Sequence, residues 1–207
     1  MPESKPSEYA QVQAEIASLP PDAQVNYLMT RLSGYWAAAY RATTDHPTDL
    51  HTVSYGSFHY LFDCFPMFSE DFKADNEHPI EPRMVAAYGV SNPNEGARDD
   101  YRLRGWVGAT ETYFGKEWDK GHFIAHSIGG AVDLVELNVF LHLRSLNRGW
   151  SDQGKRFRSM ERACSRRAGT FCFHRPLYDD ASNRPARLEF GLLREDGTFW
   201  IDLFDNL

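Results

Sequence analysis

The sequence has little of what marks membrane or secreted proteins. No apolar stretch in its 207 residues approaches the roughly 18 residues that a membrane-spanning helix needs. The first residues lack the basic start and the apolar run of a secretory signal. Internal repeats and low-complexity tracts are also absent. We therefore expect a globular protein without a membrane partner, either cytoplasmic or exported by a specialised route that needs no signal peptide.

Cysteine is scarce as well. Cys64, Cys164 and Cys172 are an odd number and lack the paired spacing of a metal site. This favours reduced thiols in packing roles in a cytosolic protein, although Cys164 and Cys172 could pair if the chain is exported. With 42% hydrophobic and 25% charged residues, the chain has the composition of a folded protein and is long enough to bury a sizeable core.

Charge is distributed unevenly. The net charge of -7 argues against simple coating of nucleic acid, but residues 142–187 contain eleven Lys and Arg against four Asp and Glu. The rest of the chain carries a charge of -14. The asymmetry is typical of a local site for a polyanion, and a solvated basic helix face explains it equally well.

The local patterns predict an α+β protein. Helices are expected over 7–19 and 23–42, and the aromatic-rich residues 51–72 suggest a buried helix leading into a loop. Residues 73–100 are rich in turn-forming residues and predict a boundary, despite an apolar run from Met84 to Val90. The remaining expectations are strands over 102–108 and 118–124, a loop entering a helix over 134–147, a basic helix over 153–167, a strand over 170–174 and a hairpin over 187–204.

One set of residues suits phosphodiester hydrolysis. Asp119-Lys-Gly-His122 stands at the end of a predicted strand, and Asn138, Asn147 and Glu161 follow. The ordinary pKa of histidine, about 6.5, suits a base that deprotonates water. Amide and carboxylate oxygens suit Mg²⁺, which keeps most of its water ligands and needs few protein ligands. Arginines of the basic segment would hold the substrate phosphate.

The same residues carry a family resemblance. Asp-Lys-Gly-His-Phe-Ile-Ala at 119–125 resembles the Asp-Arg-Gly-His-Leu-Ile-Ala signature of the DNA/RNA non-specific endonucleases, and Asn138-Val-Phe with Asn147 nine residues on resembles their Asn-Leu-Val...Asn pattern. The similarity covers about residues 102–207. It implies a ββα-metal (His-Me finger) nuclease core with one Mg²⁺, which Mn²⁺ can replace. The N-terminal region is expected to be mostly helical.

The resemblance also implies roles. His122 would be the general base, Asn147 the direct Mg²⁺ ligand and Glu161 the holder of a metal-bound water. Asn138 would fix the His-Me finger and belong to the substrate-binding residues. Asp119 would orient the local loop or the water molecules around the metal. Candidate phosphate contacts are Lys120, Arg144, Arg148, Arg156 and Arg158.

Two departures from the family pattern leave the substrate preference open. Lys120 stands where the family has Arg, which keeps the charge but loses bidentate phosphate contact. Leu141 and His142 replace the usual Pro and Gln. Double-stranded DNA is the first expected substrate, and RNA is the second.

Simpler readings of each residue stay open. His122 could be a hydrogen-bonded structural residue, Asn138 and Asn147 could be helix caps, and Glu161 could be a solvated helix residue. His126 lies four residues after His122 and suggests a zinc pair, but the sequence has no HExxH pattern. The competing classes are a catalytically inactive binding module that retains the nuclease fold and a zinc metallohydrolase.

We expect a boundary near residue 100, with an acidic region over 1–100 and the nuclease domain over 101–207. The acidic region would serve as an adaptor for delivery, as a shield over the basic cleft, or to complete the core. A nuclease without a signal peptide endangers its own cell, so we expect a bacterial toxin or antibacterial effector restrained by an immunity protein.

Overall fold

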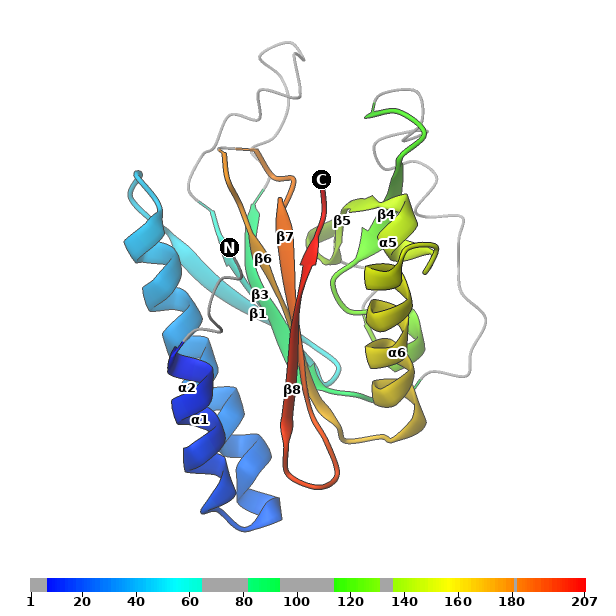
Figure 1. Ribbon diagram of the computed structural model, residues 1–207. Helices are drawn as coiled ribbons and strands as arrows, with labels where there is room; N and C mark the ends of the chain where they lie inside the picture. Colours follow the sequence, from blue (N-terminus) through cyan, green and yellow to red (C-terminus); the bar gives the residue numbers. More distant parts are fainter. Residues whose placement is uncertain (1–6, 65–81, 94–113, 131–135, 181) are drawn as a thin grey trace.

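The computed structural model describes residues 7–64, 82–93, 114–130, 136–180 and 182–207. They form a mixed α+β protein with two antiparallel sheets, one of six strands in the order β1-β2-β3-β6-β7-β8 and one made of β4 and β5 (Figure 1). The strands are β1 (Leu50–Tyr55), β2 (Phe58–Asp63), β3 (Arg83–Val90), β4 (Trp118–His122), β5 (Val139–Leu143), β6 (Phe171–Leu177), β7 (Arg187–Leu193) and β8 (Phe199–Asp205). The α-helices are α1 (Ser7–Ala17), α2 (Pro21–Thr43), α5 (Arg144–Asn147) and α6 (Asp152–Arg166), with short 3₁₀ turns η1 (His126–Ile128) and η2 (Glu136–Asn138).

The two faces of the large sheet are covered by different helices. Along β6, successive side chains point to opposite faces, as the pleat of a strand requires. Phe171 and Phe173 belong to the core cluster that includes Leu32 and Trp36 of α2, whereas Cys172 belongs to the cluster that includes Phe157 of α6. Helices α1 and α2 therefore pack on one face of the sheet, and α6 and the β4–β5 hairpin pack on the other (Figure 1).

The expected helix within 51–72 is wrong where the structure describes it. Residues 50–63 form the antiparallel hairpin of β1 and β2, which turns at Gly56 with a φ of 57°. Aromatic and β-branched side chains favour strands, and they outweigh the mixed periodicity that suggested a helix. Residues 65–72 lie outside the described residues.

The apolar run from Met84 to Val90 is not an interruption in a loop. It forms most of β3, a central strand that pairs with β2 on one side and β6 on the other. Nearly all of its residues are buried. A central strand covered on both faces has the continuous apolar pattern seen here rather than an alternating one.

In the C-terminal half, most expected elements are found. Helix α6 and strands β4, β6, β7 and β8 lie close to their predicted ranges. The expected strand over 102–108 lies outside the described residues. Residues 139–143, expected as a loop entering a helix, form the strand β5 instead, because pairing with β4 satisfies their backbone groups.

The large sheet takes strands from both sides of residue 100. β1, β2 and β3 precede it and β6, β7 and β8 follow it, so the boundary expected there does not separate two sheets. Helices α1 and α2 complete a core on the face opposite to α6 and do not lie over that basic helix (Figure 1). No helix within the described ranges combines the length and apolarity needed to cross a membrane.

Replacing Tyr9 with phenylalanine tests how firmly α1 is joined to the sheet. The buried Tyr9 hydroxyl donates to Glu189 Oε2 at 2.7 Å and accepts from Trp36 Nε1 at 3.0 Å. Tyr9→Phe should lower the free energy of unfolding by about 1–3 kcal/mol, because the indole N–H is left buried without this acceptor. Urea unfolding measures the change. The control is Tyr27→Phe, which removes a hydroxyl hydrogen-bonded to Glu15 near the surface and should cost well under about 1 kcal/mol. Equal effects would contradict the expected difference.

Candidate active site

The candidate residues lie on a β-hairpin followed by two consecutive helices. Strands β4 and β5 pair so that Asp119 faces His142 and His122 faces Val139. Helix α5 begins directly after β5, and Gly149 then turns the chain with a φ of 72°. The hydroxyl of Ser151 accepts from Gly154 N and caps the start of α6. Strands β4 and β5 and helices α5 and α6 therefore form one hairpin–helix unit, which carries Asp119, His122, Asn147 and Glu161.

Asp119 is the centre of the polar network in this unit. Its carboxylate accepts hydrogen bonds from Arg144 Nε at 2.9 Å, from Arg148 Nε at 2.7 Å and Nη2 at 2.9 Å, and from Asn147 Nδ2 at 3.1 Å. Burial alone would favour the neutral acid, but the bonds from Arg148, Asn147 and Arg144 prevail and lower the pKa of Asp119 below its ordinary value. Asp119 is therefore an anion that positions both arginines and the amide of Asn147.

The bond from Asn147 decides which of its atoms is left for another partner. A carboxylate accepts hydrogen bonds only, so it holds the NH₂ group of the amide. The amide oxygen of Asn147 is then the atom directed away from Asp119. Asn147 occupies the last position of α5 and is half-buried, so its contact with Asp119 is more specific than a helix cap would require.

His122 is the last residue of β4, where burial alternates along the strand. Asp119 and Gly121 are buried, whereas Trp118, Lys120 and His122 are half-buried. Lys120 and His122 thus share one side of the strand and Asp119 lies on the other. Burial lowers the pKa of Lys120, because a charged ammonium group loses part of its hydration there.

Asn138 fixes the chain that follows His122. Its Oδ1 accepts from Ile124 N at 2.8 Å and its Nδ2 donates to Ile124 O at 2.9 Å. The backbone adds a bond from Phe123 N to Asn138 O at 2.9 Å. Because the side chain is fully buried and both ends of its amide are used, it is not available for contact with a substrate.

Glu161 lies on the buried side of α6, together with Phe157, Met160 and Cys164. Burial raises the pKa of its carboxyl group, and the nearby Arg158 and Arg162 oppose this effect. Arg158 Nη1 lies 2.8 Å from Glu161 Oε2. The reading of Glu161 as a solvated helix residue is therefore wrong.

Every arginine expected to contact phosphate has an acidic partner. Arg144 and Arg148 bind Asp119, Arg156 lies 3.0 Å from Asp202, and Arg158 pairs with Glu161. The side chains of Arg148, Arg156 and Arg158 remain about half exposed, at 47%, 54% and 50%. Their outer faces are thus open to solvent while one side of each guanidinium is paired.

His142 and His174 are both buried, and the sequence did not link them. His142 packs between Phe140 and Phe157, with ring centroids 4.8 and 5.1 Å away, and His174 lies 5.3 Å from Phe157. Among the described residues, none of the four ring nitrogens has a hydrogen-bond partner. A Cβ at Gly121 would lie 2.4 Å from the His142 Cβ, so glycine is needed where β4 passes His142. This close approach was not anticipated from the sequence.

The zinc alternative finds no support in the described residues. His126 lies in η1 rather than on a helix with His122. Within the parts of the chain that the structure covers, no group of three or more His, Cys, Asp or Glu could hold a metal ion. Any divalent metal at the candidate residues would depend on Asn147, other oxygen atoms and water.

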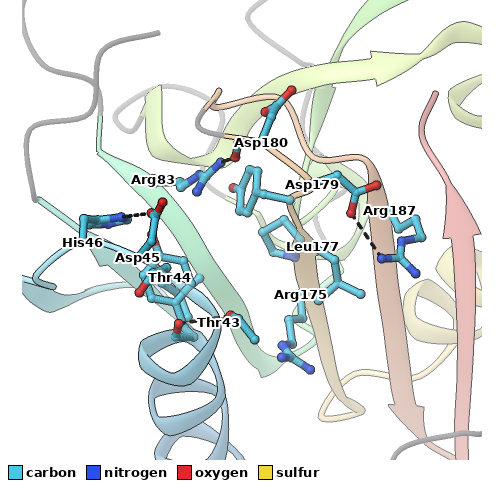
Figure 2. Close-up of a pocket in the computed structure, with 14 residues that line it drawn as sticks. Thr43, Thr44, Asp45, His46, Arg83, Arg175, Leu177, Asp179, Asp180 and Arg187 are labelled. Carbon is cyan, nitrogen blue, oxygen red and sulfur yellow. Dashed lines mark hydrogen bonds and ion pairs between the residues drawn. The ribbon is translucent and has the colours of Figure 1, made fainter.

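A separate pocket of about 440 Å³ lies between the end of α2 and strands β3, β6 and β7 (Figure 2). It contains none of the candidate catalytic residues. Arg83 covers the ring of Tyr178 at 3.8 Å and donates to the carbonyls of Asp180 and Ser182. Arg187 pairs with Asp179 across the rim. Arg83 and Arg187 of this pocket are thus both already engaged in contacts within the protein.

Neutralising Asp119 should destabilise the hairpin–helix unit. Asp119→Asn leaves Arg144 and Arg148 without their anion, and breaking a largely buried pair typically costs about 3 kcal/mol. The control is Asp202→Asn, which breaks the half-exposed pair with Arg156 and should cost less than about 1 kcal/mol. Urea unfolding of both variants gives the comparison. Similar small losses for both would show that the Asp119 network adds little stability.

Comparisons with known proteins give only a distant likeness. No protein-family model matches the chain, and no curated protein matches it. Among solved structures, one of Sda1 nuclease with a bound zinc ion is similar over 82% of this chain and 81% of that chain, with 15% identity and a TM-score of 0.39. A distant structural neighbour is thus a nuclease, and at this level of similarity no residue assignment follows from it.

Proposed function

We propose that this protein is a metal-dependent endonuclease that hydrolyses phosphodiester bonds of DNA, and of RNA as a second substrate. Strands β4 and β5 with helices α5 and α6 would form its ββα-metal core. The observation that supports this most directly is the bond from Asn147 Nδ2 to Asp119, in a unit that also carries His122 and Glu161. This bond leaves the amide oxygen of Asn147 as the atom that a metal could use.

The donor set fits magnesium. Asn147 at the end of α5 offers an amide oxygen, and Glu161 in α6 offers a carboxylate. Mg²⁺ prefers oxygen ligands and retains several waters, so few protein ligands suffice, and Mn²⁺ would replace it. When bound, the metal would neutralise charge on the phosphate and on the departing 3′ oxygen.

His122 would take the proton from the attacking water. His122 as a residue is half-buried at the end of β4, and Asn138 fixes the backbone just beyond it. A base held in one position lowers the entropic cost of reaching the reactive geometry. Asp119 would act as a positioning residue, since its bonds go to Asn147 and to the two arginines.

The basic residues would bind phosphate without reading bases. Arg148, Arg156 and Arg158 are half exposed, and α6 adds Lys155 and Arg162 on its exposed side. Contacts with phosphates position a nucleic acid but carry no sequence information. We therefore infer little sequence preference. A bacterial effector role with an immunity protein as partner stays a proposal, based on the danger that such an enzyme poses to its own cell.

The first test is cleavage by the full chain. Supercoiled plasmid and total RNA are incubated with purified protein in Mg²⁺, in Mn²⁺ and in EDTA. We expect degradation in either metal and none in EDTA, and the two substrates show which polymer is preferred. The same activity in EDTA would contradict metal dependence. No cleavage of either polymer, together with measurable binding to DNA, would favour an inactive binding module with the same fold.

A further inference from the structure

We propose that Cys164 and Cys172 form a disulfide that links α6 to the central strand β6 when the chain folds under oxidising conditions. Both cysteines are free thiols here and both are fully buried. They belong to the same core cluster, between α6 and the large sheet. The inference is independent of the proposed nuclease activity.

The arrangement of the two elements places these side chains opposite each other. Phe157, Met160 and Cys164 recur along α6 at helical spacing and face the sheet. On β6, Cys172 points toward α6, whereas its neighbours Phe171 and Phe173 point toward α2. Cys164 thus reaches the sheet near the end of α6, just before the short connection to β6.

Cys164 and Cys172 lie near enough for one thiol to influence the other. A hydrogen bond with Cys164 and, after it, burial raise the pKa of the Cys172 thiol well above its ordinary value. Two buried thiols on facing sides of a helix and a strand are candidates for a disulfide, whose S–S bond is about 2.05 Å long. Cys64, in contrast, directly follows the end of β2 and does not belong to this cluster.

The reaction is thiol–disulfide exchange with a small-molecule disulfide such as oxidised glutathione. One protein thiolate attacks the reagent, displaces one glutathione and forms a mixed disulfide. The second protein thiol then displaces the second glutathione and closes the Cys164–Cys172 bond. The two protein thiols are oxidised, the reagent is reduced to two thiols, and the protein protons end on the released glutathione.

Burial sets when this reaction occurs. Thiolate is the attacking species, and both the raised pKa of Cys172 and the lack of exposure suppress it in the folded protein. The bond is therefore expected to form during folding and only slowly afterwards. Once formed, it holds the end of α6, one helical turn beyond Glu161, against β6.

The test counts thiols in the full chain. Protein is refolded from urea with either reduced or oxidised glutathione, then denatured, alkylated and weighed by mass spectrometry. We expect three alkylated cysteines after reducing conditions and one after oxidising conditions. The Cys64→Ser variant leaves the core unchanged and should fall from two alkylated cysteines to none. Trypsin cleaves after Arg166 and Arg167, so the two cysteine peptides should stay joined only in the oxidised sample.

Three outcomes would overturn the proposal. One is an unchanged count of alkylated thiols under both conditions. Another is glutathione held on Cys164 or Cys172 in place of the link. The third is a Cys164→Ala variant that also loses two alkylated cysteines when it is refolded in oxidised instead of reduced glutathione. The folded protein kept in oxidised glutathione without urea is expected to lose thiols at least about tenfold more slowly than the refolding chain.

Discussion

His122→Ala is expected to slow Mg²⁺-dependent plasmid cleavage by about 10²–10⁴-fold. This is the range for removing a general base that takes a proton in the transition state. His122 is a half-buried residue at the end of β4, so loss of its side chain should change folding less than it changes the rate. Initial rates on supercoiled plasmid at saturating Mg²⁺ give the comparison, and far-ultraviolet circular dichroism shows that the variant is folded.

His126→Ala is the matched control for this variant. His126 lies four residues further on, in η1, and is half-buried as well. With His122 as the base, the His126 variant should keep a rate within about threefold of the wild type. Equal losses in both variants, with zinc in the purified protein, would support the zinc pair. A His122 variant that keeps its activity would remove this residue from the mechanism.

Acidification from pH 6.5 to 4.5 is expected to lower the free energy of unfolding by on the order of 5 kcal/mol. Burial lowers the pKa of both His142 and His174 to about 3. The unfolded chain, with ordinary pKa values near 6.5, binds two protons in this range that the folded chain does not. Stability is thus fully present above pH 6.5 and is lost as the pH falls toward 3, by about 1.4 kcal/mol per unit and histidine. The raised pKa of Glu161 acts in the opposite direction and reduces the slope.

Urea unfolding at half-unit steps between pH 7 and 4.5 measures this slope. His174→Phe keeps an aromatic ring beside Phe157 and Phe190 but cannot take up a proton, so it should halve the slope. His51→Asn removes an exposed histidine of β1 and should leave the slope unchanged. A His174→Phe protein with the wild-type slope would show that the buried pair does not control acid stability.

Several elements could be predicted because their signals are local. Helix α6 lies close to the range expected for the basic helix, with its apolar residues on one side. Asp196-Gly197 forms the turn between β7 and β8, with a φ of 77° at Gly197. Such signals act over a few residues, so neighbours in the sequence suffice to identify them.

Other elements could not be predicted because their partners are distant. The Met84–Val90 run becomes a strand through pairing with β2 and with β6, about 85 residues further on. Strand β5 resembles the entry to a helix until β4 pairs with it. Strand propensity depends strongly on such neighbours, and periodicity cannot supply them.

The candidate site shows the same division. The order of Asp119, His122, Asn147 and Glu161 along the chain was sufficient to suggest hydrolysis of phosphodiester bonds. It did not indicate that Asp119 holds Arg144 and Arg148 in ion pairs, or that Asn138 is fully enclosed. Hydrogen bonds to a buried carboxylate depend on which side chains the fold places within about 3 Å, and spacing along the chain does not fix this.

The sequence by itself determined the α+β character, the separation of basic and acidic segments, and the residues from which a catalytic unit is proposed. Only the tertiary structure decided that residues on both sides of position 100 share one six-stranded sheet. It also decided that His142 and His174 lose their contact with water, and that Cys164 and Cys172 lie in one buried cluster. The physical reason is common to all three. Strand pairing, desolvation and side-chain contact are properties of two or more segments at once, whereas composition and local pattern describe one segment at a time.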